Sequence, residues 1–435
     1  MATGMLLIIR CRWAILAGLF SVTSLVHGQS LDEAIRIALS QYPSIIAAQA
    51  RLNASRADII RAEGQHYPQV SWQGTTSNYS GFNSSGGATS SGIVPDNTWI
   101  QSPRVTLNIW AGGRIQADVD RAKSTSSARM HQQRLTRDEV ALFAFEAYMN
   151  WARSIELVRL AEANVRAHEK ILSDVKKITE VDEGRMIDKS QAEVRLQTAS
   201  VALQRRQAES QAAIQRLERM LLGAMPAKPT NIDDIRGVIP SSVEDALAQV
   251  NDQHPAIAIQ LAQIEAARAS VASARSQYSP TVNLSYGKQT TQGTGQGDYI
   301  TQININVPIF SGGSTYGAVG SASNELIATE QGLTEARLTL TERILSIWPQ
   351  LASTRNRKEL AERQVQTSRT LVSGYEQQFR VGRRSLLDLL TVQRDLNDYQ
   401  NSAVIAAFDE RLAKGRMIAA TGRLASAYGS SPSSP

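Results

Sequence analysis

Two segments of the chain show the same change in the spacing of apolar residues. In each, an alanine-rich helical stretch ends near a proline, and apolar residues then alternate with polar ones. The alternating residues are Val70 and Trp72, then Val105, Leu107 and Ile109, and in the second segment Val282, Leu284 and Tyr286, then Ile303, Ile305, Val307 and Ile309. A period of two is typical of a strand with two different faces, so each segment predicts a β-hairpin.

A long helical stretch follows each hairpin. Residues 114–180 contain no proline, and residues 316–380 contain only Pro349, where we expect a kink. At a rise of about 1.5 Å per residue, each stretch predicts a helix of roughly 100 Å. After short breaks at 182–184 and 381–383, helical patterns return over 186–222 and 386–421. We therefore expect two antiparallel helical hairpins, each with a shorter helix stacked on the returning one.

Heptad spacing in the second of these hairpins predicts coiled-coil contacts. The residues in heptad register are Ala361, Val365, Ser368, Val372, Tyr375 and Phe379, and then Leu389, Val392, Leu396, Tyr399, Ala403 and Ala406. Many of them are small or polar, as expected of helices that contact neighbours on two sides.

The two halves of the chain resemble each other. Pro43 is matched by Pro255, 212 residues later, and Gly112-Gly113 by Gly312-Gly313, 200 residues later. The change of register falls in the Gly/Ser/Asn-rich stretch 80–97, where an insertion indicates an exposed hairpin tip. The predicted division is a first repeat at 29–240, a second repeat at 241–425 and a disordered tail at 426–435.

Residues 1–28 have the pattern of a cleaved signal peptide: basic residues, a short apolar run and a small-residue ending. Cys11, the one cysteine of the chain, lies within it, so we expect a mature protein without thiols or disulfides. Removal of Arg10 and Arg12 with the leader lowers the formal charge from +6 to +4. No basic cluster with interleaved aromatic residues accompanies this charge, so we expect no nucleic-acid partner.

No later segment has the apolar length of a membrane helix, so a membrane-embedded part would be β-structure. Each alternating run has the length of a tilted transmembrane strand, although an ordinary soluble sheet has the same pattern. Four strands leave two unpaired edges, which lipid does not tolerate. Symmetric association would remove these edges, and three protomers would give twelve strands, but the strands alone do not fix the number of protomers.

Over nearly the whole mature chain, the repeat, the turns "NIWAGGRIQADVDRAKS" and "VPIFSGGSTYGAVGSAS", and the segment "FRVGRRSLLDLLTVQRDLND" resemble the TolC-like outer-membrane factors. The resemblance implies a mainly α fold with membrane β: a homotrimer whose twelve-stranded β-barrel, four strands per protomer, sits in outer-membrane lipid. This barrel is continuous with a long α-helical coiled-coil barrel in the periplasm. The resemblance also implies a passive exit duct that docks onto a periplasmic adaptor and an inner-membrane ABC or RND-type transporter.

The resemblance further implies a periplasmic gate. Asp388 matches a position whose carboxylates form a ring at the constriction, Asp188 is its counterpart in the first repeat, and Arg384 matches an arginine that ties the closed helices together. Thr391 stands where a second ring aspartate is found, and Phe379 where a tyrosine bonds its neighbour, so we expect weaker cation block and no hydroxyl lock. The alternative for both aspartates is a purely structural role, because a carboxylate in a first helical turn suits the helix dipole.

Two sets of turn residues complete the predicted sites. The tip turns expected to face the adaptor contain Gly184, Arg185, Gly382, Arg383 and Ser385. Gly112, Gly113, Gly312 and Gly313 are predicted to form tight strand-to-helix turns.

Other function classes find little support in the sequence. No nucleophile, base and acid can be assembled into a catalytic set, and the scattered histidines lack metal-ligand spacing, so we expect no enzyme, cofactor or metal site. A periplasmic coiled-coil adaptor is an alternative, but it would have one helical hairpin rather than two with strands at the far end. For the cargo, the resemblance favours type I secretion of a polypeptide, an adhesin among the candidates, with small-molecule efflux as the alternative.

Overall fold

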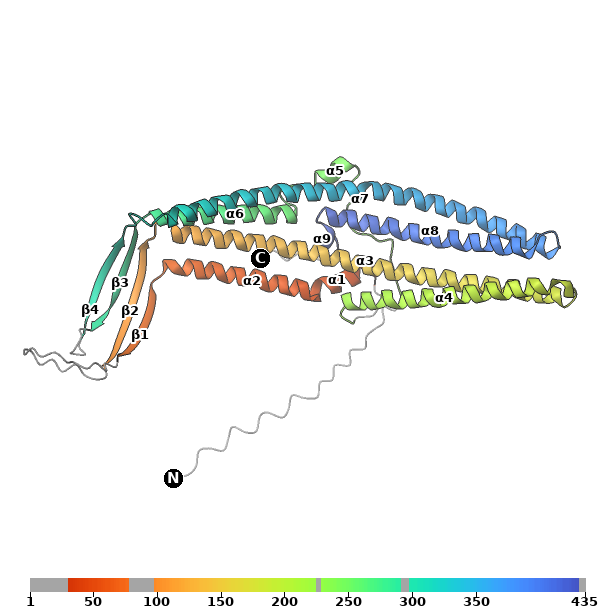
Figure 1. The fold of residues 1–435 in the computed structure, drawn as a ribbon, viewed down its shortest axis with the longest axis horizontal. Coiled ribbons are helices and arrows are strands. Elements are labelled where there is room, and N and C mark those ends of the chain that lie inside the picture. The colour runs from red at the N-terminus through yellow and green to blue at the C-terminus, as the bar shows by residue number, and fades with distance from the viewer. Residues whose placement is uncertain (1–29, 78–97, 224–227, 291–296, 430–435) are drawn as a thin grey trace, which may run out of the picture.

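The protein has a β-sheet at one end and two helical hairpins at the other, joined by helices that run most of its length (Figure 1). The computed structural model describes residues 30–77, 98–223, 228–290 and 297–429. The predicted signal peptide at 1–28 and the end of the predicted tail lie outside these residues. None of the described helices combines the length and apolarity needed to cross a bilayer.

Each half of the chain forms two helices, a β-hairpin, a long helix and a returning helix. The first half contains α1 (Leu31–Gln41), α2 (Pro43–Glu63), β1 (Gln69–Ser77), β2 (Thr98–Trp110), α3 (Arg114–Thr179) and α4 (Met186–Met220). The second contains α5 (Val243–Leu247), α6 (Pro255–Arg275), β3 (Thr281–Thr290), β4 (Gly297–Asn306), α7 (Ser314–Arg380) and α8 (Leu386–Ala420), followed by α9 (Leu424–Tyr428). Short 3-10 turns at Gly64–His66, Glu183–Arg185 and Ser276–Tyr278 connect some of these elements.

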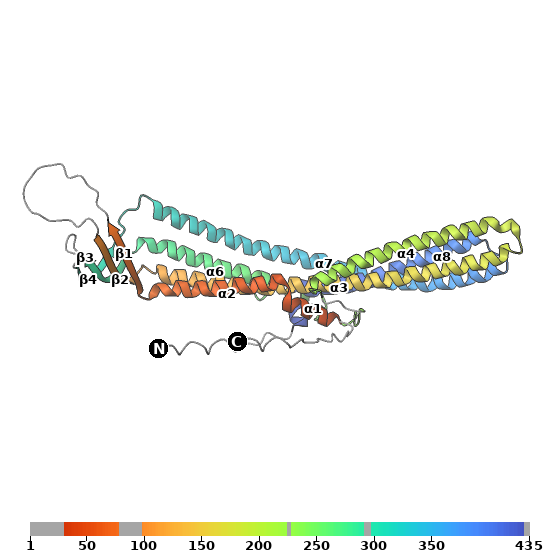
Figure 2. The ribbon, with the colours of Figure 1, turned by 90° about the horizontal axis from the view of Figure 1, so that it is seen from below.

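The lengths of corresponding helices agree closely between the halves. Helices α3 and α7 have 66 and 67 residues, α4 and α8 have 35 each, and α2 and α6 have 21 each. Helix α7 is continuous through Pro349, so the proline does not break it, and Figure 1 shows a gentle curve along its length. Figure 2 shows the two helical hairpins lying together at the end opposite the sheet.

The four strands form one antiparallel sheet in the order β1-β2-β3-β4. Its register aligns apolar residues on one face, with Val70 opposite Val105 and Leu107 opposite Leu284. Polar residues align on the other face, where Asn108 and Asn283 lie opposite each other and their side chains share a hydrogen bond of 2.8 Å.

Strand β4 is shorter than predicted. It ends at Asn306, so Val307 and Ile309 lie beyond the ladder although they continue the alternation. The physical reason is Pro308, which has no N–H to donate and interrupts pairing.

Tight turns then lead from strands to helices. Gly112 and Gly113 have φ values of +61° and +87°, and Gly312 and Gly313 have +62° and +86°, a region that favours glycine. Gly112 is also closely packed, because a Cβ atom there would lie 2.3 Å from Cβ of Ser279.

The largest core lies at the waist, where α1, α3, α9 and the ends of α4 and α8 meet. Tyr148 and Trp151 of α3 are fully buried there and pack edge to face, with ring centroids 5.5 Å apart. The described C-terminal residues belong to this core. Tyr428 is 2% exposed, and its hydroxyl accepts a 3.0 Å hydrogen bond from the amide of Arg236. The predicted tail boundary at 426 therefore falls inside α9 and is wrong, because this segment buries apolar surface.

The predicted coiled-coil seam of α7 is confirmed. Its members Ala361, Val365, Ser368, Val372 and Phe379 are buried, and Tyr375 is half-buried. Along α8, the heptad residues Leu389, Leu396 and Ala406 are buried and Val392 and Ala403 half-buried, whereas Tyr399 is 36% exposed.

Candidate gate at the helical tips

The turns α3–α4 and α7–α8 lie together at the end of the molecule farthest from the sheet (Figures 1 and 2). They share a small apolar core, formed by Ile171, Leu172, Val175, Ala192, Phe379, Leu386, Leu389 and Leu390. Because this core draws on both halves of the chain, the two hairpins form one packed tip.

The α7–α8 turn has a well-formed helix end and helix start. The amides of Gly382 and Arg383 donate to the carbonyls of Phe379 and Gln378, at 3.0 and 2.9 Å, and Gly382 has a φ of +76°. This is a Schellman-type ending, which requires a left-handed residue. Ser385 then caps α8, since its Oγ accepts a 3.1 Å hydrogen bond from the amide of Asp388.

The α3–α4 turn reverses the chain with a different backbone, because Glu183–Arg185 form a 3-10 turn and Gly184 does not have the positive φ of Gly382. Oδ1 of Asp182 accepts a 3.1 Å hydrogen bond from the amide of Gly184. Arg185 precedes α4 and provides no side-chain cap. The two turns therefore differ both in backbone conformation and in the residues that cap the following helix.

Each predicted gate aspartate lies beside an arginine of its own turn. Asp188 accepts from Nε and Nη2 of Arg185, at 2.8 and 2.7 Å, and both side chains are about a quarter exposed. Asp388 lies 4.0 Å from Nη1 of Arg384, and both of these side chains are more than 40% exposed. In the Arg185–Asp188 pair, two guanidinium nitrogens make charge-assisted hydrogen bonds to the carboxylate. The Arg384–Asp388 pair is exposed and longer, and such a pair contributes only about 0–1 kcal/mol to stability.

Both arginines also stack on aromatic rings of α7. The guanidinium of Arg185 lies 5.5 Å from the ring centre of Phe379, and that of Arg384 lies 4.7 Å from the ring centre of Tyr375. Nε of Arg384 further donates to Oε1 of Gln378 at 3.1 Å. Phe379 is 3% exposed, so it contributes a buried face to the tip where a tyrosine would contribute a hydroxyl.

Two ion pairs join α3 directly to α7 near the tip. Lys170 lies 3.4 Å from Glu376, and Arg380 lies 3.6 Å from Asp174. At both pairs at least one side chain is largely exposed, so we expect them to select the alignment of the helices more than to stabilise the tip.

The structure therefore brings Arg185, Asp188 and Phe379 into one contact group, and Arg384, Asp388 and Tyr375 into another. Thr391 remains outside both, because its exposed hydroxyl donates to the carbonyl of Leu387 at 2.8 Å. Gly184, Arg383 and Ser385 are exposed at the very end of the tip.

Two contacts were not predicted from the sequence: those of Arg384 with Tyr375 and Gln378, and the pair of Lys170 with Glu376 across the halves. Tyr375 was recognised only as a heptad position. Its place one helical turn before Phe379 was the available signal, since residues four apart share a helix face. Among the described residues, no group of three or more His, Cys, Asp or Glu side chains is arranged to hold a metal ion.

Comparisons with known proteins agree with this architecture. The family model "Outer membrane efflux protein" matches residues 34–223 and 246–423. The outer membrane efflux protein BepC of Brucella suis is 25% identical over 94% of this chain and 89% of its own length. The alkaline protease secretion protein AprF of Pseudomonas aeruginosa is 24% identical over 64% of this chain and 60% of its own length.

Solved structures show the same fold. A crystal structure of CusC superposes with a TM-score of 0.78 at 17% identity, covering 90% of this chain and 91% of CusC. The outer membrane protein VceC of Vibrio cholerae gives 0.76 at 19% identity, covering 90% of this chain and 96% of VceC.

The predicted resemblance to TolC-like factors and the outer-membrane location are thus confirmed, and the adaptor alternative is dropped. The family model extends over both halves of the chain and includes both tip turns. The protein belongs to the outer membrane efflux protein family.

Proposed function

We propose that this protein is the passive exit duct of a tripartite export system. In this proposal three copies associate, the sheets close in outer-membrane lipid, and the helical tips dock onto a periplasmic adaptor and an inner-membrane ABC or RND-type transporter. The protein itself performs no chemical step. The proposal rests on the architecture of the molecule. A sheet with one apolar and one polar face lies at one end, and the packed tips of two helical hairpins lie at the other.

The apolar face of the sheet supports a lipid-exposed position. Val70 is 80% exposed, Ile303 is 63% exposed and Ile305 is 67% exposed, which is unusual for a sheet in water. The opposite face is polar, as the wall of an aqueous duct requires.

The edges of the sheet support association. Among the described strands, β1 and β4 each pair with a neighbour on one side only. An unpaired edge in lipid costs several kcal/mol per orphaned backbone group, so each edge would pair with the opposite edge of the next copy. Three copies then give the twelve strands of the implied barrel.

The gate assignment is tested by single-channel recording in planar bilayers, with and without divalent cations. Replacing Asp388 by Ala removes a carboxylate from the constriction, so we expect higher conductance and weaker cation block. Arg384→Glu places two carboxylates side by side and removes the stacking on Tyr375, so we expect longer and larger openings.

Arg394→Glu is the matched control for the charge reversal. Arg394 is an exposed residue of the same helix that pairs with its neighbour Asp395 at 3.1 Å, and it lies away from the turn. We expect it to leave gating unchanged. Unaltered conductance and block in both Asp388→Ala and Arg384→Glu would show that these residues serve only the helix ends.

For the cargo, we propose a polypeptide exported by type I secretion, with an adhesin among the candidates. Small-molecule efflux is the second candidate, supported by the name of BepC, whereas the name of AprF supports secretion. Deletion of the gene distinguishes them. Secretion predicts that a specific polypeptide disappears from the medium while tolerance to toxic compounds is unchanged. Efflux predicts the reverse.

A further inference from the structure

A large polar cavity lies where the sheet meets the helices. Its volume is about 920 Å³, and it is bounded by the polar face of the sheet and by the ends of α2 and α3 nearest the sheet. Four arginines and two aspartates line it: Arg61, Arg104, Arg114 and Arg121, with Asp58 and Asp118.

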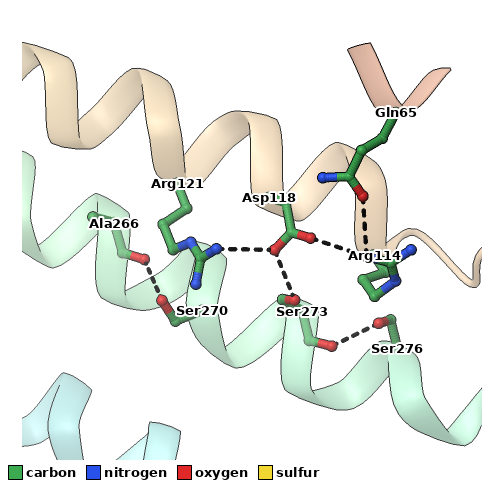
Figure 3. A network of polar contacts seen from close by, with 8 residues as sticks. All are labelled: Gln65, Arg114, Asp118, Arg121, Ala266, Ser270, Ser273 and Ser276. Carbon is green, nitrogen blue, oxygen red and sulfur yellow. Dashed lines mark hydrogen bonds and ion pairs between the residues drawn. The ribbon is translucent and has the colours of Figure 1, made fainter. Parts of the chain in front are cut away.

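The helix residues leave one positive charge uncompensated. Asp118 is shared between Arg114 and Arg121, at 3.3 and 3.4 Å, and also accepts a 3.1 Å hydrogen bond from Ser273 (Figure 3). Arg114 donates in addition to Gln65 at 3.2 Å. One carboxylate therefore serves two guanidinium groups, whereas Arg61 has its own partner in Asp58, at 3.0 Å.

Arg104 adds a second positive charge, from the sheet. It is exposed, and no hydrogen bond or ion pair from the described part of the chain reaches its guanidinium. Its neighbours across the ladder are Ser71 on β1 and Gly287 on β3, two of the smallest residues available. Within the described residues, the Arg104 guanidinium on the polar face is therefore flanked across the ladder by small residues and has no charged partner.

The other charges of the strands define its setting. Lys288 is the other basic residue of the four strands, and the alternation of β3 places it on the apolar face. Asp298 lies opposite Gln289, on the polar face, two strands from Arg104 and closer to the loops. The negative charge of Asp298 counteracts the positive charge of Arg104, but Asp298 does not line the cavity.

We propose that Arg104 makes this junction favour anions, so that the duct selects for anionic solutes at its sheet end. The proposal rests on the proposed duct, in which the polar face borders the lumen. Three copies would place three Arg104 guanidinium groups around one water-filled path. Like charges lining a narrow path concentrate the opposite ion there.

The test is the reversal potential of single channels in a potassium chloride gradient at low salt. A unit charge about 8 Å from the ion path changes the local ion concentration roughly twofold when screening is weak. We therefore expect Arg104→Gln to lower the chloride-to-potassium permeability ratio at least about twofold, and Arg104→Glu to lower it further. Asp298→Asn should raise the ratio.

Lys288→Gln is the matched control, because it removes the same charge from the opposite face of the same sheet. We expect no change in its permeability ratio. If Arg104→Glu channels conduct with an unchanged chloride-to-potassium permeability ratio, the inference is overturned but the proposed duct function is not. Trimers that insert yet never conduct, even with Arg384→Glu, contradict the duct and the inference together.

A binding measurement does not depend on the gate. Pyranine, a trisulfonated dye, is titrated with the detergent-solubilised protein and followed by fluorescence anisotropy. We expect Arg104→Gln to weaken binding at least about twofold, and Lys288→Gln to leave it unchanged. Equal binding by wild type and Arg104→Gln would overturn the proposal.

Discussion

At the scale of single residues, a close approach of α8 to α3 depends on Gly415. A Cβ atom at this position of α8 would lie 2.2 Å from Cε1 of Phe145, which is fully buried on α3. We expect Gly415→Ala to destabilise the protein by about 1–3 kcal/mol, because overpacking outweighs the gain of up to about 1 kcal/mol in helix propensity. Thermal unfolding of the purified protein measures the effect.

Gly374→Ala is the control for this prediction. Gly374 lies inside α7, and a Cβ atom there would meet nothing within 4 Å. Its unfolding temperature should stay the same or rise. A second substitution, Phe145→Leu, should recover part of the loss in Gly415→Ala. Full stability of Gly415→Ala alone would contradict the packing argument.

Asp138 predicts a pH dependence at the waist. Burial raises the pKa of this carboxyl to about 6, although it accepts a 2.7 Å hydrogen bond from the amide of Ala425 and lies near Arg137. The unfolded pKa is about 3.9, so the folded state binds the proton more tightly. The contribution of Asp138 to the free energy of unfolding is therefore fully present below about pH 4 and is lost as pH rises through about 6. The loss amounts to roughly 3 kcal/mol.

Asp138→Asn should remove this dependence, because an amide oxygen still accepts from Ala425 but carries no charge. We expect the unfolding temperature of the wild type to fall between pH 4 and pH 7 relative to that of the variant. Parallel curves for the two proteins would mean that Asp138 does not titrate in this range.

At the scale of elements, Arg185 links the start of α4 to the end of α7. Lysine keeps its charge but loses the two-nitrogen contact with Asp188 and the planar stacking on Phe379. We expect Arg185→Lys to destabilise the tip by about 1 kcal/mol and to speed amide exchange in the first turns of α4. Arg205→Lys is the control, since Arg205 is 67% exposed and lies 3.8 Å from Glu209. Equal exchange in both variants would refute the link.

The elements themselves were largely predictable, because apolar periodicity and glycine pairs act locally. Ser385 was foreseeable for the same reason, as a cap three residues before Asp388 in the next turn. The stacking of Arg185 on Phe379 was not, because it joins different halves of the chain and no local pattern encodes it. Similarly, the alternation through Val307 gave no sign that the ladder stops at Asn306, although Pro308 did.

At the scale of the whole molecule, the two halves agree in shape and differ in charge. The α3–α4 turn carries the exposed acids Glu180, Asp182 and Glu183, whereas the α7–α8 turn carries the exposed bases Arg380, Arg383 and Arg384. Similar lengths let the two hairpins end together, and the opposite charges favour their lying next to each other. Charge therefore distinguishes two tips whose helices are nearly equal in length.

The opposite charges of the two turns determine how many equivalent binding sites a partner finds at the tips. In a threefold assembly, six helical hairpins of nearly equal length would end in a ring in which acidic and basic tips alternate. A partner that recognises only the paired helices would meet six similar sites, whereas one that recognises the charge of the turns would meet three of each kind. The complex would contain either three or six partner chains for every three copies of this protein. Six would indicate that the partner recognises the paired helices, and three that it recognises the charge of the turns.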